Sequence, residues 1–201
     1  MSSGLGAGER PKIENENLKL ARPKLEFGFS AATQYPDQTL AMKIRACGDD
    51  DLSQLYAIQS RCPLAAQWRL EDYRQLIHDP LGLILVAEFD DAGRPGVAGF
   101  AAFHRVLDEA ELRNMAVDPE HRRNGIARAL LTEGIRILAR QGVSRLFLEM
   151  RASNQAAIGL YRSVDFKLMN TRRDYYHNPD EDAWVMACNI ALPQDTSPGE
   201  R

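Results

Sequence analysis

The sequence predicts a mixed α/β fold built on one central sheet, and three features of the chain support this prediction. Residues 110–150 read as a strand, a small-residue turn, an amphipathic helix and a second strand. Two β-rich runs separated by a turn precede this unit, and polar, aperiodic segments stand at both ends of the chain. A length of 201 residues with 44% hydrophobic content suits one domain plus tails.

Two helices and several strands are expected before the central unit. Asp49–Asp51 places acidic groups at a helix start, and Asp79-Pro80 ends the next helix. The turn-rich segment 90–95 joins two β-rich runs and predicts a hairpin. The expected elements are, in order, strand 42–45, helix 52–59, helix 70–77, and strands 83–87, 96–103 and 109–117.

The second half is expected to hold a sheet-covering helix at 125–141, because its apolar residues recur with the helical period. The apolar side of that helix carries Leu130, Leu131, Gly134, Ile137 and Leu138. The nearly unbroken apolar run 146–148 predicts a central strand covered on both faces. A helix capped by Ser153 or Asn154, and strands at 166–171 and 183–190, complete the pattern.

The chain is expected to divide into an N-terminal tail at 1–41, disordered or loosely attached, a folded domain at 42–191, and a C-terminal tail at 192–201. Met42 is a candidate true or alternative start, because the strand pattern begins there. A formal charge of −3 gives no reason to expect a nucleic-acid surface. No membrane span or signal peptide is expected, so cytoplasmic residence is the default.

No metal site is expected, since the histidines and the cysteines lack ligand spacing. Cys47, Cys62 and Cys188 are read as reduced, mostly buried residues. A cysteine nucleophile with a histidine base stays open, because such pairing is spatial.

The segment 122–128 contains a candidate phosphate-binding turn. Gly125 and Ala127 leave backbone N–H groups accessible at a helix start, while Arg122, Arg123 and Arg128 add positive charge. By itself, such a turn is more often an ordinary helix start than a phosphate site.

A longer pattern resembles a known family. Arg122-x-x-Gly125-x-Ala127 is similar to the pyrophosphate loop of the GNAT N-acetyltransferase superfamily. Further segments resemble its RimI-type ribosomal-protein-alanine N-acetyltransferases: 107–112, 116–119, 148–154, 160–161 and 172–176. Three departures from that pattern are Ala127 for a second glycine, Val164-Asp165-Phe166 for Leu-Gly-Phe, and Gln67-Trp68 for Pro-Trp.

The resemblance implies a GNAT-like mixed, mostly antiparallel central sheet flanked by helices on both faces, and acetyl-CoA as the acetyl donor. It implies backbone contacts to the thioester carbonyl near a splayed or bulged strand. The implied donor-binding residues are Met115, Ala116, Val117, Arg122, Arg123, Asn124, Gly125, Ile126, Ala127, Arg128 and Asn154. Capping alone would also explain Asn154.

Glu149 stands where an apolar strand ends, which suits a general base. An exposed carboxylate, or one that forms an ion pair with Arg151, would explain this position equally well. The resemblance implies the catalytic reading, and it implies that Tyr161 is the general acid rather than a packed core residue. Trp68, Tyr175 and Tyr176 are candidate acceptor contacts, although aromatic packing looks the same in sequence.

The leading hypothesis is transfer of acetyl to a protein N-terminus, most plausibly the alanine of a small-subunit ribosomal protein. One alternative is acetylation of a small amine or of a broader set of N-termini. Another is an acyl-CoA-binding regulatory module without turnover, which the presence of both Glu149 and Tyr161 argues against.

Overall fold

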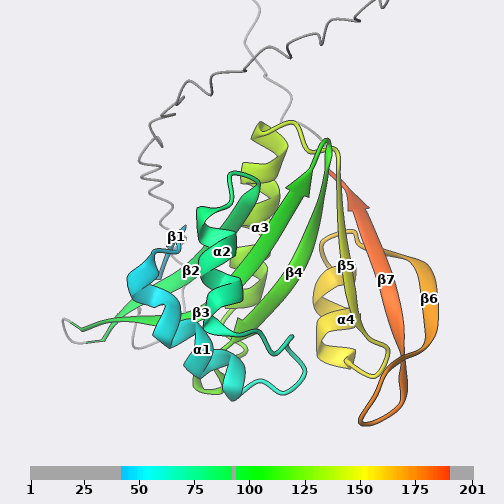
Figure 1. Ribbon diagram of the computed structural model, residues 1–201, viewed down its shortest axis with the longest axis horizontal. Helices are drawn as coiled ribbons and strands as arrows, with labels where there is room; N and C mark the ends of the chain where they lie inside the picture. Colours follow the sequence, from blue (N-terminus) through cyan, green and yellow to red (C-terminus); the bar gives the residue numbers. More distant parts are fainter. Residues whose placement is uncertain (1–41, 92–93, 191–201) are drawn as a thin grey trace, which may run out of the picture.

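The computed structural model describes residues 42–91 and 94–190, in which helices lie on both faces of one seven-stranded sheet (Figure 1). The tails expected at 1–41 and 192–201 lie outside the described residues. None of the helices in this part of the chain is long and apolar enough to cross a lipid bilayer.

The strand order across the sheet is β1-β2-β3-β4-β5-β7-β6, and every neighbouring pair is antiparallel except β4 and β5. The prediction of a mixed, mostly antiparallel sheet is therefore confirmed. The strands are β1 (Lys43–Ala46), β2 (Gly82–Asp91), β3 (Arg94–Val106), β4 (Glu109–Val117), β5 (Arg145–Arg151), β6 (Lys167–Tyr176) and β7 (Glu181–Asn189).

The helices divide between the two faces of the sheet. On one face, α1 and α2 pack over β2, β3 and β4, and on the other face α3 and α4 cover the sheet. Short 3-10 turns precede α1 and α3. These elements are η1 (Asp49–Asp51), α1 (Leu52–Ser60), α2 (Leu70–His78), η2 (Pro119–His121), α3 (Ile126–Arg140) and α4 (Gln155–Arg162).

The hairpin formed by β2 and β3 is longer than the sequence predicts. Strand pairing continues to Asp91 and Arg94, inside the segment 90–95 that was expected to be a turn. Backbone pairing at an exposed hairpin end requires no apolar side chains, so the polar composition marks the turn without fixing where it starts.

The expectation that β5 is covered on both faces is wrong. Leu146, Leu148 and Met150 are buried against the α3 and α4 side, whereas Phe147 and Glu149 are only half-buried. The helices of the opposite face pack over β2, β3 and β4. One face of the central strand is consequently left open, and the candidate base lies on it.

A β-bulge reverses the inward-facing pattern of β4. Ala102 pairs with Asn114 and Phe103 pairs with Leu112, so Arg113 has no partner in β3. Before the bulge, Leu112 belongs to the core under α3. After it, Ala116 belongs to the core under α1 and α2. A strict alternation read from the sequence would place the second half of β4 on the wrong face.

The family pattern has a glycine where this chain has Asp165, and the backbone explains the preference. Asp165 follows α4 with a φ of +64°, and the next N–H, that of Phe166, returns to the carbonyl of Tyr161. Aspartate is one of the few non-glycine residues that tolerate this conformation. The departure therefore preserves the turn geometry.

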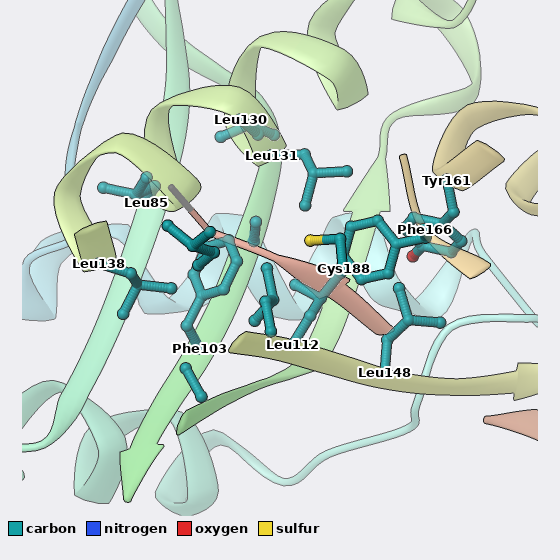
Figure 2. Close-up of a cluster of buried hydrophobic side chains, with 14 of the residues drawn as sticks. Leu85, Phe103, Leu112, Leu130, Leu131, Leu138, Leu148, Tyr161, Phe166 and Cys188 are labelled. Carbon is teal, nitrogen blue, oxygen red and sulfur yellow. The ribbon is translucent and has the colours of Figure 1, made fainter. Parts of the chain in front are cut away.

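The larger core lies between the sheet and α3, where Phe103 packs among Leu112, Leu138 and their neighbours (Figure 2). Gly134 of α3 faces this ring. A Cβ atom at residue 134 would stand 2.3 Å from Cζ and 2.6 Å from Cε2 of the fully buried Phe103. The close approach of α3 to the sheet thus depends on the missing side chain.

We expect Gly134→Ala to lower the free energy of unfolding by about 1–3 kcal/mol, because overpacking outweighs the gain in helix propensity. The matched control is Gly159→Ala in α4, where a Cβ meets nothing within 4 Å. That variant should be at least as stable as the wild type. Urea unfolding of both variants measures the effect, and equal stability of the two would contradict this account of the packing.

Candidate active site

The strands β4 and β5 pair over only part of their length. Their parallel pairing runs from Glu109 and Arg145 to Leu112 and Leu148, and both strands then continue without pairing with each other. Figure 1 shows the two strands close together at one end and separating toward the other. The backbone groups of Met115, Ala116 and Val117 lie along this opening, beside the bulge at Arg113.

The expectation of a splayed or bulged strand is therefore met, with the bulge slightly before Met115. Separation leaves backbone N–H groups on the open edge of β4 without a partner strand. Such groups can donate to a carbonyl oxygen that enters the opening.

The turn before α3 is shaped for an anion. Gly125 has a φ of +77° and Arg123 a φ of +68°, and α3 starts directly afterwards. Within the described residues, no group accepts a hydrogen bond from the N–H of Asn124 or Gly125. These donors, together with the first N–H groups of α3, are of the kind that phosphate oxygens accept from. The side chain of Ile126 is buried in the core, so its contribution there is confined to the backbone.

Two arginines of this turn are held by hydrogen bonds. Arg122 donates to Sγ of Cys62 (3.2 Å) and to the carbonyl of Val117 (3.3 Å), and Arg128 donates to Oγ of Ser163 (2.7 Å). All these partners are neutral. In the described part of the chain, neither arginine nor Arg123 pairs with a carboxylate, so the charge remains available to an anionic ligand.

The end of α1 is fastened to the end of β4 by an ion pair between Arg61 and Asp118. Asp118 is only 5% exposed and also accepts from the N–H of Glu120 (3.0 Å), which caps η2. A buried carboxylate is tolerated because it is paired and hydrogen-bonded. Nothing in the sequence indicated Arg61 as the partner of Asp118.

Glu149 is the first residue of β5 beyond its last pair with β4. Its side chain is 23% exposed, and Oε1 lies 2.8 Å from Nη2 of Arg172 on β6. The strand continues to Arg151, so Glu149 does not stand at its end as the sequence predicted. The suggested pairing with Arg151 is also wrong, because that guanidinium pairs with Glu181 at the start of β7 (3.2 Å).

A hollow of about 400 Å³ opens beside Glu149 on the uncovered face of β5. Its polar walls carry three carboxylates, those of Glu109, Glu111 and Glu149, together with the Arg172 guanidinium and the His104 imidazole. Phe147 and Val185 supply apolar surface. This balance of charge favours a ligand with a cationic head and an apolar body.

Tyr161 lies on the other side of the sheet, in α4. Its ring packs on Phe166 with centroids 5.5 Å apart, and both belong to the core under α3 and α4 (Figure 2). Burial raises the pKa of the Tyr161 hydroxyl above its usual range, so the phenol stays protonated at neutral pH. Asn154 caps α4 by accepting from the N–H of Ala157 (3.2 Å), which decides between Ser153 and Asn154 as the cap.

The candidate acceptor residues do not gather in one hollow. Tyr176 lies near Glu149, and burial, with the Glu149 charge second, raises the pKa of its hydroxyl. Tyr175 stands edge-on to Tyr176, with ring centroids 5.2 Å apart, and is half-exposed. Trp68 instead lines a separate hollow of about 260 Å³ with Arg113, whose guanidinium lies 5.4 Å from the indole. The bulged segment of β4 therefore stands between Trp68 and Glu149.

Trp68 is held by a buried polar network that the sequence did not reveal. Gln59, 1% exposed, donates to the carbonyl of Trp68 (2.6 Å) and accepts from its N–H (3.0 Å). The Tyr73 hydroxyl donates to the same Gln59 oxygen and accepts from Nδ2 of Asn114 (2.9 Å). Asn114 also donates to the carbonyl of Ala66 (2.9 Å). Helices α1 and α2 and the Trp68 loop are thus tied to the bulge of β4.

We expect Tyr73→Phe to lower the free energy of unfolding by about 1–3 kcal/mol, because the buried Gln59 oxygen and the buried Asn114 amide each lose one of their two hydrogen-bond partners. It should also shift the emission of Trp68, measured in a Trp184→Phe background that leaves one tryptophan. Tyr56→Phe, at an exposed position on α1, is the control and should change neither quantity. An unchanged Trp68 emission spectrum in the Tyr73 variant would show that the network does not determine the conformation of the Trp68 loop.

A cysteine nucleophile is disfavoured by the structure. Burial raises the pKa of the Cys47 thiol to about 12 and that of Cys188 to about 11, so neither forms a thiolate at neutral pH. Cys62 is buried and donates to the carbonyl of Val117 (3.4 Å), next to Arg122. Within residues 42–91 and 94–190, no cluster of three histidine, cysteine or acidic side chains could hold a metal ion.

Comparison with known proteins places this geometry in a family. The model of the acetyltransferase (GNAT) family matches residues 51–166, which include the candidate phosphate-binding turn, the opening between β4 and β5, and both candidate catalytic residues. The chain belongs to the GNAT acetyltransferase family.

The curated relatives it matches include [ribosomal protein bS18]-alanine N-acetyltransferases. The protein of this name from Escherichia coli K12 is 50% identical over 98 residues, which are 48% of this chain and 66% of the relative. The one from Haemophilus ducreyi is 45% identical over 94 residues, which are 45% of this chain and 65% of the relative. In these matches the chain spans slightly less than two thirds of the relatives' length.

Solved structures agree over a longer stretch. The ribosomal-protein-S18-alanine N-acetyltransferase from Escherichia coli superposes with a TM-score of 0.65 at 36% identity, covering 77% of this chain and 97% of that one. A ribosomal-protein-alanine N-acetyltransferase from Brucella melitensis gives 0.64 at 26% identity, covering 74% of this chain and 99% of that one. The predicted GNAT fold is confirmed.

Proposed function

We propose that this GNAT-family protein transfers acetyl from acetyl-CoA to the α-amino group of the N-terminal alanine of ribosomal protein bS18. The observation that carries the proposal is the place of Glu149: a carboxylate at the point where β4 and β5 separate, facing an acidic hollow. The printed names of the similar proteins from Escherichia coli supply the acceptor. Ribosomal proteins are made in the cytoplasm, and the proposal places the enzyme there.

The donor would lie across the end of the opening. Backbone N–H groups at 123–127 and the charges of Arg122, Arg123 and Arg128 suit the diphosphate of CoA. The pantetheine arm would follow α4 near Asn154, and the thioester carbonyl would accept from the free edge of β4 at Met115, Ala116 or Val117. Each of these residues belongs to a feature described above.

The chemistry would then need a base and an acid. A protein α-amino group has a pKa of about 7.7–8.0, so removing its proton needs only modest help. Glu149 would accept this proton through a water molecule, and the nitrogen would attack the thioester carbon. As the C–S bond breaks, Tyr161 would give its proton to the departing sulfur, and the second proton that the nitrogen loses as the amide forms would return to the phenolate. Its raised pKa keeps the phenol protonated until that step.

The acidic hollow favours a cationic amine over a neutral acceptor. Tyr175 and Tyr176 at its edge would contact the first residues of the peptide, and Trp68 would contact the chain farther along, beyond Arg113. The open face of β5 leaves room for a polypeptide rather than enclosing a small ligand. Acetylation of a small amine is therefore the second choice.

A panel of short peptides that differ only in their first residue tests the acceptor. With acetyl-CoA, we expect peptides that carry the bS18 N-terminal sequence and start with alanine to be acetylated fastest, with the product located by mass spectrometry. Transfer confined to small amines would contradict the proposal. Saturable acetyl-CoA binding without any transfer would identify a regulatory binding module instead.

The catalytic roles are tested by conservative replacements. We expect Glu149→Gln and Tyr161→Phe each to lower kcat/KM for the peptide by about 100-fold or more, because each removes a proton-transfer group. The dissociation constant for acetyl-CoA should be unchanged. Glu71→Gln, on the exposed side of α2, is the control. Wild-type turnover by both site variants would reject the assignments.

A further inference from the structure

Glu149, the proposed base, forms an ion pair with an arginine from another strand. Arg172 lies on β6, which pairs with β7 and not with β5, so its side chain reaches across β7 to Glu149. Among the residues that line the acidic hollow, it supplies the one guanidinium. The pair therefore occupies the place where the proposed function requires a cationic amine to bind.

The Arg172 side chain is half-exposed to solvent. It is 49% exposed, and its guanidinium also lies 5.3 Å from the centre of the Tyr175 ring. The strand that carries it is at the edge of the sheet and has a register shift between Arg172 and Tyr176, with Asp174 at a φ of +52°. Partly exposed ion pairs contribute little stability, so another cation can replace the guanidinium at small cost.

Without an ion-pair partner, Glu149 would also promote a side reaction that consumes the donor. A carboxylate that activates an amine through water can also activate that water against the same thioester. In that reaction the water oxygen forms a bond to the acetyl carbon and its proton passes to Glu149. The C–S bond then breaks, and the sulfur takes a proton from Tyr161. The products are acetate and CoA, and the donor is lost.

We propose that Arg172 is a specificity-determining residue that withholds Glu149 from water until the acceptor's ammonium group displaces it. This inference rests on the proposed role of Glu149. The exchange replaces one cation by another, so the carboxylate never faces the thioester without a partner. The acceptor thus both supplies the nucleophile and releases the base that activates it.

The test is the rate of CoA release from acetyl-CoA without any acceptor, with acetate identified by NMR. We expect Arg172→Ala to raise this rate about tenfold, a part of what a general base contributes. Arg172→Lys keeps a cation and should stay closer to the wild type. Adding Glu149→Gln to Arg172→Ala should remove the gain, which a purely structural effect of the arginine would not do.

Arg173→Ala is the matched control, since Arg173 is an exposed arginine next along the same strand, and its hydrolysis rate should equal that of the wild type. A wild-type hydrolysis rate in Arg172→Ala, with acetyl-CoA binding and circular dichroism unchanged, would overturn the inference. So would an increase that persists in the double variant. Peptide acetylation by the wild-type enzyme is measured separately, so failure of the proposed function would be visible on its own.

Discussion

The separation of β4 from β5 is the constraint on which the rest of the structure depends. Parallel strands ordinarily satisfy each other's backbone groups, and here they do so only as far as Leu112 and Leu148. Beyond this point the free edge of β4 can donate to a ligand, and the half-buried Glu149 lies on the open face of β5. The helices α3 and α4 start near the same opening, which directs their N-termini toward one space. A single interruption of the sheet therefore creates the proposed donor site and the place of the proposed base together.

Keeping the opening in shape requires contacts between its walls. The ion pair of Arg61 with Asp118 and the hydrogen bond of Arg122 to Cys62 fasten the end of α1 to the turn before α3. The network through Gln59 and Tyr73 fastens the Trp68 loop to the bulge. All these contacts lie on the α1 and α2 side. On the β6 and β7 side, Arg151 pairs with Glu181 and the half-exposed Arg172 pairs with Glu149.

Much of this arrangement could be predicted from the sequence, because it depends on patterns among residues that are close together in the chain. The period of α3, the cap at Asn154 and the turn at Gly125 are signals between neighbours in the chain. The covering of β5 was predicted wrongly, because an apolar run does not say how far the helices of the other face extend. The partner of Glu149 was missed because Arg172 approaches it across β7, and strand order is a property of the whole sheet.

The bulge at Arg113 has a consequence for how this protein can diverge. One additional residue in β4 turns the strand over, so that Leu112 and Ala116 belong to different cores. Exchanges of amino acid along β4 are local events that each core absorbs separately. An insertion or deletion in β4 would move every later side chain to the opposite face of the sheet, as far as the turn at Gly125. Lineages of this fold should therefore vary freely in the identity of residues along β4 and hardly at all in their number.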